Sequence, residues 1–419
     1  MKHVILGNGP AGVIAAETLR KHSPGAEIVM IGCEDAPPYS RMAIPYLLMG
    51  NIHESGTYLR KEPGYFEKLQ VQQVRGKAAS LDLKAKKLTL EGEGDQISYD
   101  KLLIATGSVP IRPPIPGIEL PGVHPCWTLE DARSIAKFAK PGSRVLQMGA
   151  GFIGCIILEA LASRKVELTV VEMGDRMVPR MMTPVAGGMI KQWVQSQGVQ
   201  VYTDTRVEEI AQSSSGLAVK LSNGKTIEVD LVISATGVKP NIGYLNPLEL
   251  DLGIGILVDN FMRTSHPDVY AAGDVAESID FSTGHRIINA IQPNAAEQAR
   301  IAAINMSGGQ AQSLGALQIN VLDTLGLISS SFGLWSGAKD GDHVEVIDPE
   351  HYKYLRLEFL GDVLVGATCV GVTEHIGVLR GLIQGKVDLG EWKKILMKEP
   401  TKVMDAYLAK GQAQSTWMN

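Results

Sequence analysis

Residues 3–12 of this chain read HVILGNGPAG, a short apolar strand that runs into a glycine-rich turn. Residues 145–154 repeat the arrangement as VLQMGAGFIG. Both turns have the spacing GxGxxG. In this spacing the first glycine permits a tight turn, the second lets a pyrophosphate approach the backbone, and the third lets the next helix pack on the strand. The duplication therefore predicts two dinucleotide-binding units in one chain.

An acidic residue follows each turn at the end of the next predicted strand. Glu34 follows the strand over residues 27–31, and Glu172 closes the strand after the second turn. Such a carboxylate accepts hydrogen bonds from a ribose diol, while backbone N–H groups and the helix dipole meet the phosphates. Because Glu172 would repel a 2′-phosphate, the second unit is expected to prefer NAD to NADP. Arg176 and Arg180 lie downstream, and whether they contact the cofactor or are solvated surface charge stays open at this stage.

Length and composition limit the number of domains and the kinds of partner to expect. With 419 residues, 45% hydrophobic and 20% charged, the chain is expected to form two or three globular domains. A net charge of −5 without a long basic run argues against nucleic acid as a partner. No apolar run approaches the length of a membrane span, and the first strand leaves no room for a signal peptide. We expect a cytoplasmic protein.

The cysteines are scattered, without any CxxC pair. We therefore expect neither a disulfide framework nor a metal or iron–sulfur site held by the protein, and any electron centre must come from a bound cofactor. Each cysteine is expected to be a small buried hydrophobic residue rather than a reactive thiol. The four are Cys33, Cys126, Cys155 and Cys369.

The two units also leave their sheets through similar sequences. Residues 101–110 read KLLIATGSVP, and residues 230–240 read DLVISATGVKP. Residues 268–276 then read DVYAAGDVA, an apolar strand that ends in Gly-Asp. With these motifs the chain resembles, along nearly its whole length, the FAD-dependent pyridine nucleotide oxidoreductases. The branch in question contains rubredoxin and ferredoxin reductases, nitrite reductase flavoproteins, NADH oxidases and apoptosis-inducing factor.

The resemblance implies an α/β fold with two Rossmann-like domains of the glutathione reductase type and a smaller α+β domain at the C-terminus. Residues 1–112 and 241–315 would form a discontinuous FAD-binding domain. Residues 113–240 would form the NAD-binding domain, and residues 316–419 an interface domain.

The resemblance also implies roles for individual residues. Asp274 should hydrogen-bond the ribityl chain of FAD, Ala78 should lie near its adenine, and Arg41 should lie near the cofactor. Pro293 should start a helix over residues 294–306 whose N-terminus points at the flavin. The residues expected to bind FAD and NAD are Gly7, Gly9, Pro10, Ala11, Gly12, Glu34, Arg41, Ala78, Thr106, Gly107, Gly273, Asp274, Pro293, Gly149, Gly151, Phe152, Ile153, Gly154, Glu172 and Gly237.

Departures from the family carry further information. Met42 stands where NADH oxidases and CoA-disulfide reductases have a redox cysteine, and Pro10 stands where the oxidases have a histidine. Many relatives have an ion pair of lysine and glutamate beside the flavin, at positions that hold Tyr46 and Ile156 here. Because Met42 stands at the position of the redox cysteine, thiol chemistry is not expected. Whether Tyr46 stacks on the ring, supplies a hydroxyl or only packs stays open.

Hydride transfer between nicotinamide and flavin needs no protein acid or base, so we expect no catalytic side chain and no metal. The leading hypothesis is an NAD(H) oxidoreductase that exchanges electrons through FAD with a separate redox protein or iron–sulfur subunit. The flavin subunit of a tungsten aldehyde oxidoreductase is one such setting. The alternatives are a self-sufficient NADH oxidase or quinone reductase, and a flavoprotein scaffold similar to apoptosis-inducing factor. The direction of electron flow and the oligomeric state stay open.

Overall fold

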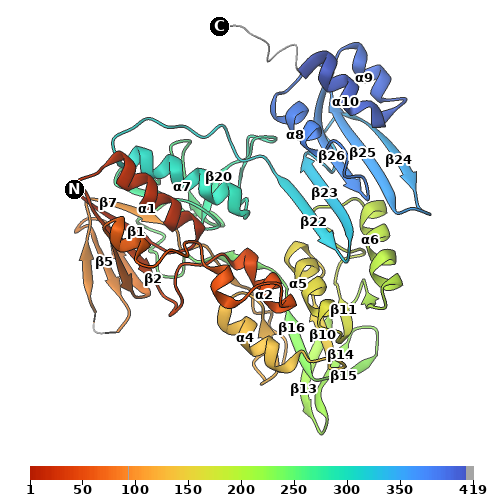
Figure 1. The fold of residues 1–419 in the computed structure, drawn as a ribbon, viewed down its shortest axis with the longest axis horizontal. Helices are drawn as coiled ribbons and strands as arrows, with labels where there is room; N and C mark the ends of the chain where they lie inside the picture. The colour runs from red at the N-terminus through yellow and green to blue at the C-terminus, as the bar shows by residue number, and fades with distance from the viewer. Residues whose placement is uncertain (93, 412–419) are drawn as a thin grey trace. The chain divides into compact units, whose positions relative to one another are not determined.

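The computed structural model describes residues 1–92 and 94–411 (Figure 1). The chain splits into two compact units. Unit 1 comprises Met1–Ile111, Trp127–Leu129 and Val238–Ala316. Unit 2 comprises Arg112–Cys126, Glu130–Gly237 and the described residues from Leu317 onward. The α/β fold with parallel sheets is confirmed, and the division into three domains stays a prediction.

Unit 1 is built around a parallel sheet in the order β19-β7-β1-β2-β3. Its inner strands are almost entirely apolar because both faces of a parallel sheet are covered. Helices α1 (Pro10–His22) and α7 (Gln292–Met306) lie side by side (Figure 1). The strands are β1 (Lys2–Leu6), β2 (Glu27–Gly32), β3 (Val71–Arg75), β7 (Lys101–Ile104) and β19 (Val269–Ala271).

Smaller elements complete unit 1. One antiparallel sheet consists of β4 (Ala78–Asp82), β5 (Lys87–Leu90) and β6 (Gln96–Ser98). Another sheet consists of β18 (Ile256–Leu257), β20 (Ala276–Ile279) and β21 (Arg286–Ile287), and β8 (Ser108–Pro110) pairs with β17 (Val238–Pro240). The short helices are η1 (Arg41–Ala43), α2 (Ile44–Met49), η2 (Glu54–Thr57) and α3 (Tyr65–Lys68).

Unit 2 repeats the parallel design in the order β12-β11-β10-β16-β9. A tight hairpin turn lies at Asn223-Gly224, since β14 (Gly216–Leu221) pairs antiparallel with β15 (Thr226–Val229) and Gly224 has a φ of +84°. The strands are β9 (Val123–Pro125), β10 (Arg144–Met148), β11 (Glu167–Val171), β12 (Gln200–Tyr202), β13 (Val207–Ser213), β14 (Gly216–Leu221), β15 (Thr226–Val229) and β16 (Leu231–Ser234). The helices are α4 (Leu129–Phe138), which begins at the last unit 1 residue of its segment, α5 (Phe152–Ser163) and α6 (Pro184–Ser196).

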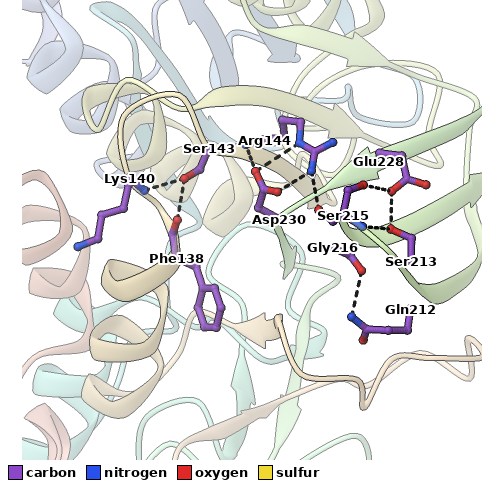
Figure 2. Close-up of polar contacts among 10 residues, drawn as sticks. All are labelled: Phe138, Lys140, Ser143, Arg144, Gln212, Ser213, Ser215, Gly216, Glu228 and Asp230. Carbon is purple, nitrogen blue, oxygen red and sulfur yellow. Dashed lines mark hydrogen bonds and ion pairs between the residues drawn. The ribbon is translucent and has the colours of Figure 1, made fainter.

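An ion pair joins the N-terminal ends of two neighbouring strands in this sheet. Figure 2 shows Arg144, the first residue of β10, donating from its guanidinium to Asp230, which directly precedes β16 (2.6 Å). The backbone N–H of Arg144 also donates to Asp230 (2.8 Å). The hydrogen bonds from Arg144 hold the pKa of Asp230 below its usual value. This ion pair joins β10 and β16 at their N-terminal ends, which lie opposite the glycine-rich turn that follows β10.

The C-terminal part of unit 2 is an antiparallel sheet in the order β22-β23-β26-β25-β24. It packs on the parallel part, because β22 contacts α5 and β26 contacts α6. Trp193 on α6 donates from its indole nitrogen to the carbonyl of Thr324 (3.0 Å). The elements are β22 (Ile319–Thr324), β23 (Leu327–Gly333), β24 (Asp342–Asp348), β25 (Lys353–Leu360), β26 (Val363–Val370), α8 (Ile376–Gln384), α9 (Glu391–Leu396), η3 (Pro400–Lys402), α10 (Val403–Ala406) and η4 (Tyr407–Gly411). In the described part of the chain, no helix is long and apolar enough to cross a membrane.

Candidate functional site

The first glycine-rich turn lies at the carboxyl end of β1. Gly7 has a φ of +118° and donates its N–H to the carbonyl of Ile31 (2.8 Å). A Cβ on Gly7 would lie 2.1 Å from the carbonyl oxygen of Ala105, and a Cβ on Gly12 would lie 2.0 Å from that of Gly7. These two glycines are therefore required by backbone contacts.

The middle glycine of this turn has open space around it. Gly9 is the N-cap of α1, with φ −73° and ψ −170°, and no side chain caps the helix. A Cβ at Gly9 would meet no atom within 4 Å. Pro10 is the first residue of α1, as predicted, and the first-turn N–H groups of Ala11 and Gly12 have no partner inside the helix. An anion beside this turn would accept hydrogen bonds from them.

The second glycine-rich turn has the same geometry. Gly149 has a φ of +96°, and its Cβ would lie 2.4 Å from the carbonyl oxygen of Ala235. A Cβ on Gly154 would lie 2.4 Å from the carbonyl oxygen of Gly149. Gly151, the N-cap of α5, has φ −72° and ψ −171° and again open space around its Cβ position. The structure thus contains two glycine-rich turns with matching backbone geometry.

Other predicted residues lie around these turns. Phe152 and Ile153 are the first residues of α5. Gly107 and Gly237 each follow a strand of their sheet and have φ of +66° and +112°. The hydroxyl of Thr106 donates to the carbonyl of Asn241 (3.0 Å) and joins the two segments of unit 1. Ala78 is buried at the start of β4.

The acid of unit 1 lies in a cluster of side chains. The guanidinium of Arg41 donates to one oxygen of Glu34 (2.8 Å), and the hydroxyl of Tyr39 donates to the other (2.7 Å). Arg41 also donates to the carbonyl of Trp127 (2.7 Å) and stacks over its ring, with 5.3 Å from Cζ to the ring centroid. Arg41 thus lies next to Glu34 and neutralises its charge. Each carboxylate oxygen still has capacity for another donor, such as a ribose hydroxyl.

A second acid in unit 1 follows β19. The carboxylate of Asp274 accepts from the hydroxyl of Ser108 (2.8 Å). Burial raises the pKa of Asp274, while the Ser108 hydrogen bond and the charge of Arg41 lower it. Gly273, with a φ of +82°, donates its N–H to the side chain of buried Gln298 (2.9 Å). The Gly-Asp motif is therefore held by α7.

The N-terminus of α7 lies close to the same cluster of unit 1. The helix begins at Gln292, one residue before the predicted start, because proline is tolerated at the second helical position as well as the first. The hydroxyl of Ser40 donates to the side chain of Gln292 (2.6 Å). The amide nitrogens of Asn289 and Asn294 are buried and have no partner among the described residues. Unsatisfied donors beside an uncapped helix start suit a ligand rich in acceptors.

The acid of unit 2 contacts backbone rather than side chains. One oxygen of Glu172 accepts from the N–H of Ala150 (2.7 Å), inside the glycine-rich turn, and the other from the N–H of Gly174 (2.8 Å). The Arg176 guanidinium donates to the carbonyls of Met182 (3.0 Å) and Pro179 (3.2 Å) and to a neighbouring aspartate. Its donors are thus engaged by its own loop, which disfavours a contact with a 2′-phosphate.

The thiols are poorly suited to redox chemistry. Burial raises the pKa of Cys126 and Cys155 to about 12 and that of Cys369 to about 11. Cys33 is exposed, and partial desolvation and the charge of Glu34 raise its pKa as well. The nucleophile is the thiolate, so a raised pKa disfavours the reactive form of each thiol near neutral pH.

Two of the residues at which the chain departs from the family are exposed. Met42 is 48% exposed in η1, and Tyr46 is 53% exposed in α2. Neither side chain is buried in the core of unit 1, so the packing interpretation of Tyr46 is not favoured.

Sequence reasoning missed several residues of this cluster. Trp127, Ser108 and Gln298 contact predicted residues, and Gln292 contacts Ser40, but none of the four was singled out from the sequence. Ser108 lies in the quoted ATGSVP stretch, which was a usable signal. Trp127 comes from a short stretch of unit 1 that is flanked in the chain by unit 2 segments, and no local pattern in the sequence marks it.

The comparisons with known proteins agree with this geometry. A family model described as pyridine nucleotide-disulphide oxidoreductase matches residues 1–300. The chain is 33% identical over 408 residues to the NADH-dependent phenylglyoxylate dehydrogenase subunit epsilon of Aromatoleum evansii, with 96% of each protein covered. It is also 33% identical over 320 residues to an NADH oxidase of Methanocaldococcus jannaschii. This match covers 74% of this chain and 71% of the relative.

A solved structure also matches closely. The NAD-dependent persulfide reductase from A. fulgidus has a TM-score of 0.85 and 30% identity, and the match covers 93% of this chain and 78% of that one. The open space at Gly9 and Gly151 and the buried, unpartnered amide nitrogens of Asn289 and Asn294 leave room and donors for ligands rich in acceptors.

Proposed function

The chain belongs to the pyridine nucleotide-disulphide oxidoreductase family, and from this premise we propose that it exchanges electrons between NAD(H) and a separate redox protein or iron–sulfur subunit. It is an FAD-dependent NAD(H) oxidoreductase, as the motifs predicted, and such enzymes pass electrons to redox partners or to oxygen. Bound flavin supplies the step between hydride chemistry and single-electron chemistry. The external partner, its iron–sulfur centre and a cytoplasmic location are the proposed part.

The observation that carries the proposal is the state of the thiols. All four cysteines have raised pKa values, and Met42 occupies the position of the redox cysteine in the thiol-dependent branches. Electrons therefore leave the flavin directly, without a protein disulfide. Direct electron transfer from the flavin to an external acceptor suits a docked redox protein.

We propose that the residues predicted from the sequence bind the cofactors. In unit 1, the turn at Gly9 would receive the pyrophosphate of FAD, with Glu34 on the ribose and Asp274 on the ribityl chain. In unit 2, the turn at Gly151 would receive NAD(H), with Glu172 on the adenosine ribose. These assignments are supported by the matching turns, the open Cβ positions and the paired acids.

A multisubunit setting is favoured by one relative. The protein from Aromatoleum evansii is named as a subunit of an NADH-dependent dehydrogenase, and this chain matches it along 96% of both lengths. The tungsten aldehyde oxidoreductase setting stays one proposed form of such a complex. The second candidate, a self-sufficient NADH oxidase, is favoured by the relative from Methanocaldococcus jannaschii.

The test is purification of the native protein with its partners, followed by metal analysis and by NADH oxidation in air. A copurifying iron–sulfur protein that is needed for NADH or NAD turnover would support the proposal. Rapid NADH oxidation with oxygen by the isolated chain would favour the oxidase. Slow turnover with artificial dyes in a correctly folded flavoprotein would favour the scaffold.

A further inference from the structure

A tryptophan from a short stretch of unit 1, flanked in the chain by unit 2 segments, contacts the side chains around Glu34 and Asp274. Trp127 clusters with unit 1, although Cys126 and Glu130 on either side belong to unit 2. Its indole Nε1 donates to the carbonyl of Ser108 (3.0 Å), and its own carbonyl accepts from Arg41 (2.7 Å). The side chain of Trp127 is thus hydrogen-bonded to Ser108, and its main chain to Arg41.

Each of these contacts leads to a carboxylate. The guanidinium of Arg41 also donates to Glu34 (2.8 Å), and the hydroxyl of Ser108 donates to Asp274 (2.8 Å). Trp127 therefore lies at the centre of a continuous path from Glu34 to Asp274, the two acids proposed for FAD. The positive charge of Arg41 also acts on Asp274, where it opposes the effect of burial.

We infer that Trp127 is a positioning residue for FAD, which fixes Arg41 and Ser108 and through them the orientations of both acids. An isolated, partly exposed ion pair contributes little, because two flexible side chains lose entropy on pairing. The guanidinium of Arg41 is instead fixed by a carbonyl acceptor and by aromatic rings, with Cζ 5.6 Å from the ring centroid of Tyr39 and 5.3 Å from that of Trp127. Glu34 is thereby preorganised before the cofactor arrives. The inference rests on the proposed FAD site.

The test titrates FAD into flavin-free protein and follows the quenching of flavin fluorescence. Trp127→Phe keeps an aromatic face beneath Arg41 but leaves the Ser108 carbonyl without its indole donor, so the Kd for FAD should rise about twofold to tenfold. Trp127→Leu also removes the ring, and the Kd should rise about tenfold to a hundredfold. The thermal unfolding midpoint of each flavin-free variant checks the fold.

Trp193 provides a matched control. Its indole nitrogen also donates to a main-chain carbonyl, that of Thr324, but in unit 2. Trp193→Phe therefore loses the same kind of hydrogen bond and should leave the Kd for FAD within about twofold of the wild-type value.

A double variant separates positioning from a merely structural role. If Trp127 acts through Glu34, the effect of Trp127→Leu on FAD affinity should shrink in a Glu34→Gln background, whereas independent effects would add. An unchanged Kd in Trp127→Leu, or an undiminished effect in the double variant, would overturn the inference. The proposed function fails separately, if NADH does not reduce the flavin of the wild-type protein.

Discussion

The two glycine-rich units have nearly the same backbone but different surroundings for their acids. The N-caps differ by only 1° in each backbone angle, with φ and ψ of −73° and −170° at Gly9 against −72° and −171° at Gly151. Glu34 is paired with an arginine and a tyrosine, whereas Glu172 accepts from two backbone N–H groups. In the proposed assignment, the shared turn would recognise the pyrophosphate common to both cofactors, and the environment of the acid would distinguish the two sites.

The largest effect is expected from filling the open space at the two turns. Gly9→Val places a side chain where the pyrophosphate must approach the backbone, so the variant should purify without flavin. Gly151→Val should keep its flavin and lose reduction by NADH. Flavin absorbance and stopped-flow reduction measure the two properties. Full flavin occupancy in Gly9→Val would show that residues 7–12 are not the FAD turn.

The next largest effect concerns the two arginines near the acids. Arg41→Leu removes hydrogen bonds to Glu34, Tyr39 and Trp127, and the Kd for FAD should rise about a hundredfold. Arg176→Leu is the matched control, since that guanidinium caps carbonyls of its own loop in unit 2. It should leave FAD binding unchanged. Equal loss of FAD in both variants would contradict the division of roles.

A smaller effect is expected at Glu172. A charge-assisted hydrogen bond contributes about 1.5–3 kcal/mol, so Glu172→Ala should lower kcat/KM with NADH about tenfold to a hundredfold. The wild-type protein should prefer NADH, and the variant should narrow the gap to NADPH because a repulsive charge is removed. Steady-state kinetics with both nucleotides measures this. Equal wild-type efficiency with NADPH would mean that Arg180, which is exposed, determines the preference.

The smallest effect is expected from the cysteines. Replacing all four by serine or alanine should leave the rate of flavin reduction by NADH within about threefold of wild type, because raised pKa values keep the thiols protonated. A specific loss of reduction in one single-cysteine variant, with the fold and the flavin content intact, would return the chain to the thiol-dependent branches.

The sequence was most informative where structure is local. The glycine turns, the strands that precede them and Pro10 at the start of α1 were predictable, because a positive φ or a missing side chain is needed at fixed spacing along the chain. The family was predictable for the same reason. The start of α7 was misplaced by one residue, since helix ends depend on weak preferences that proline alone does not decide.

The sequence alone therefore determined the two dinucleotide turns, their acids and the absence of a redox cysteine beside the flavin segment. Only the tertiary structure decided that Arg41 pairs with Glu34, that Trp127 joins the cluster from 86 positions away, and that the C-terminal sheet packs with unit 2. The physical reason is that these contacts join residues distant in the chain. Their free energy depends on packing and burial, which no local pattern of residues encodes.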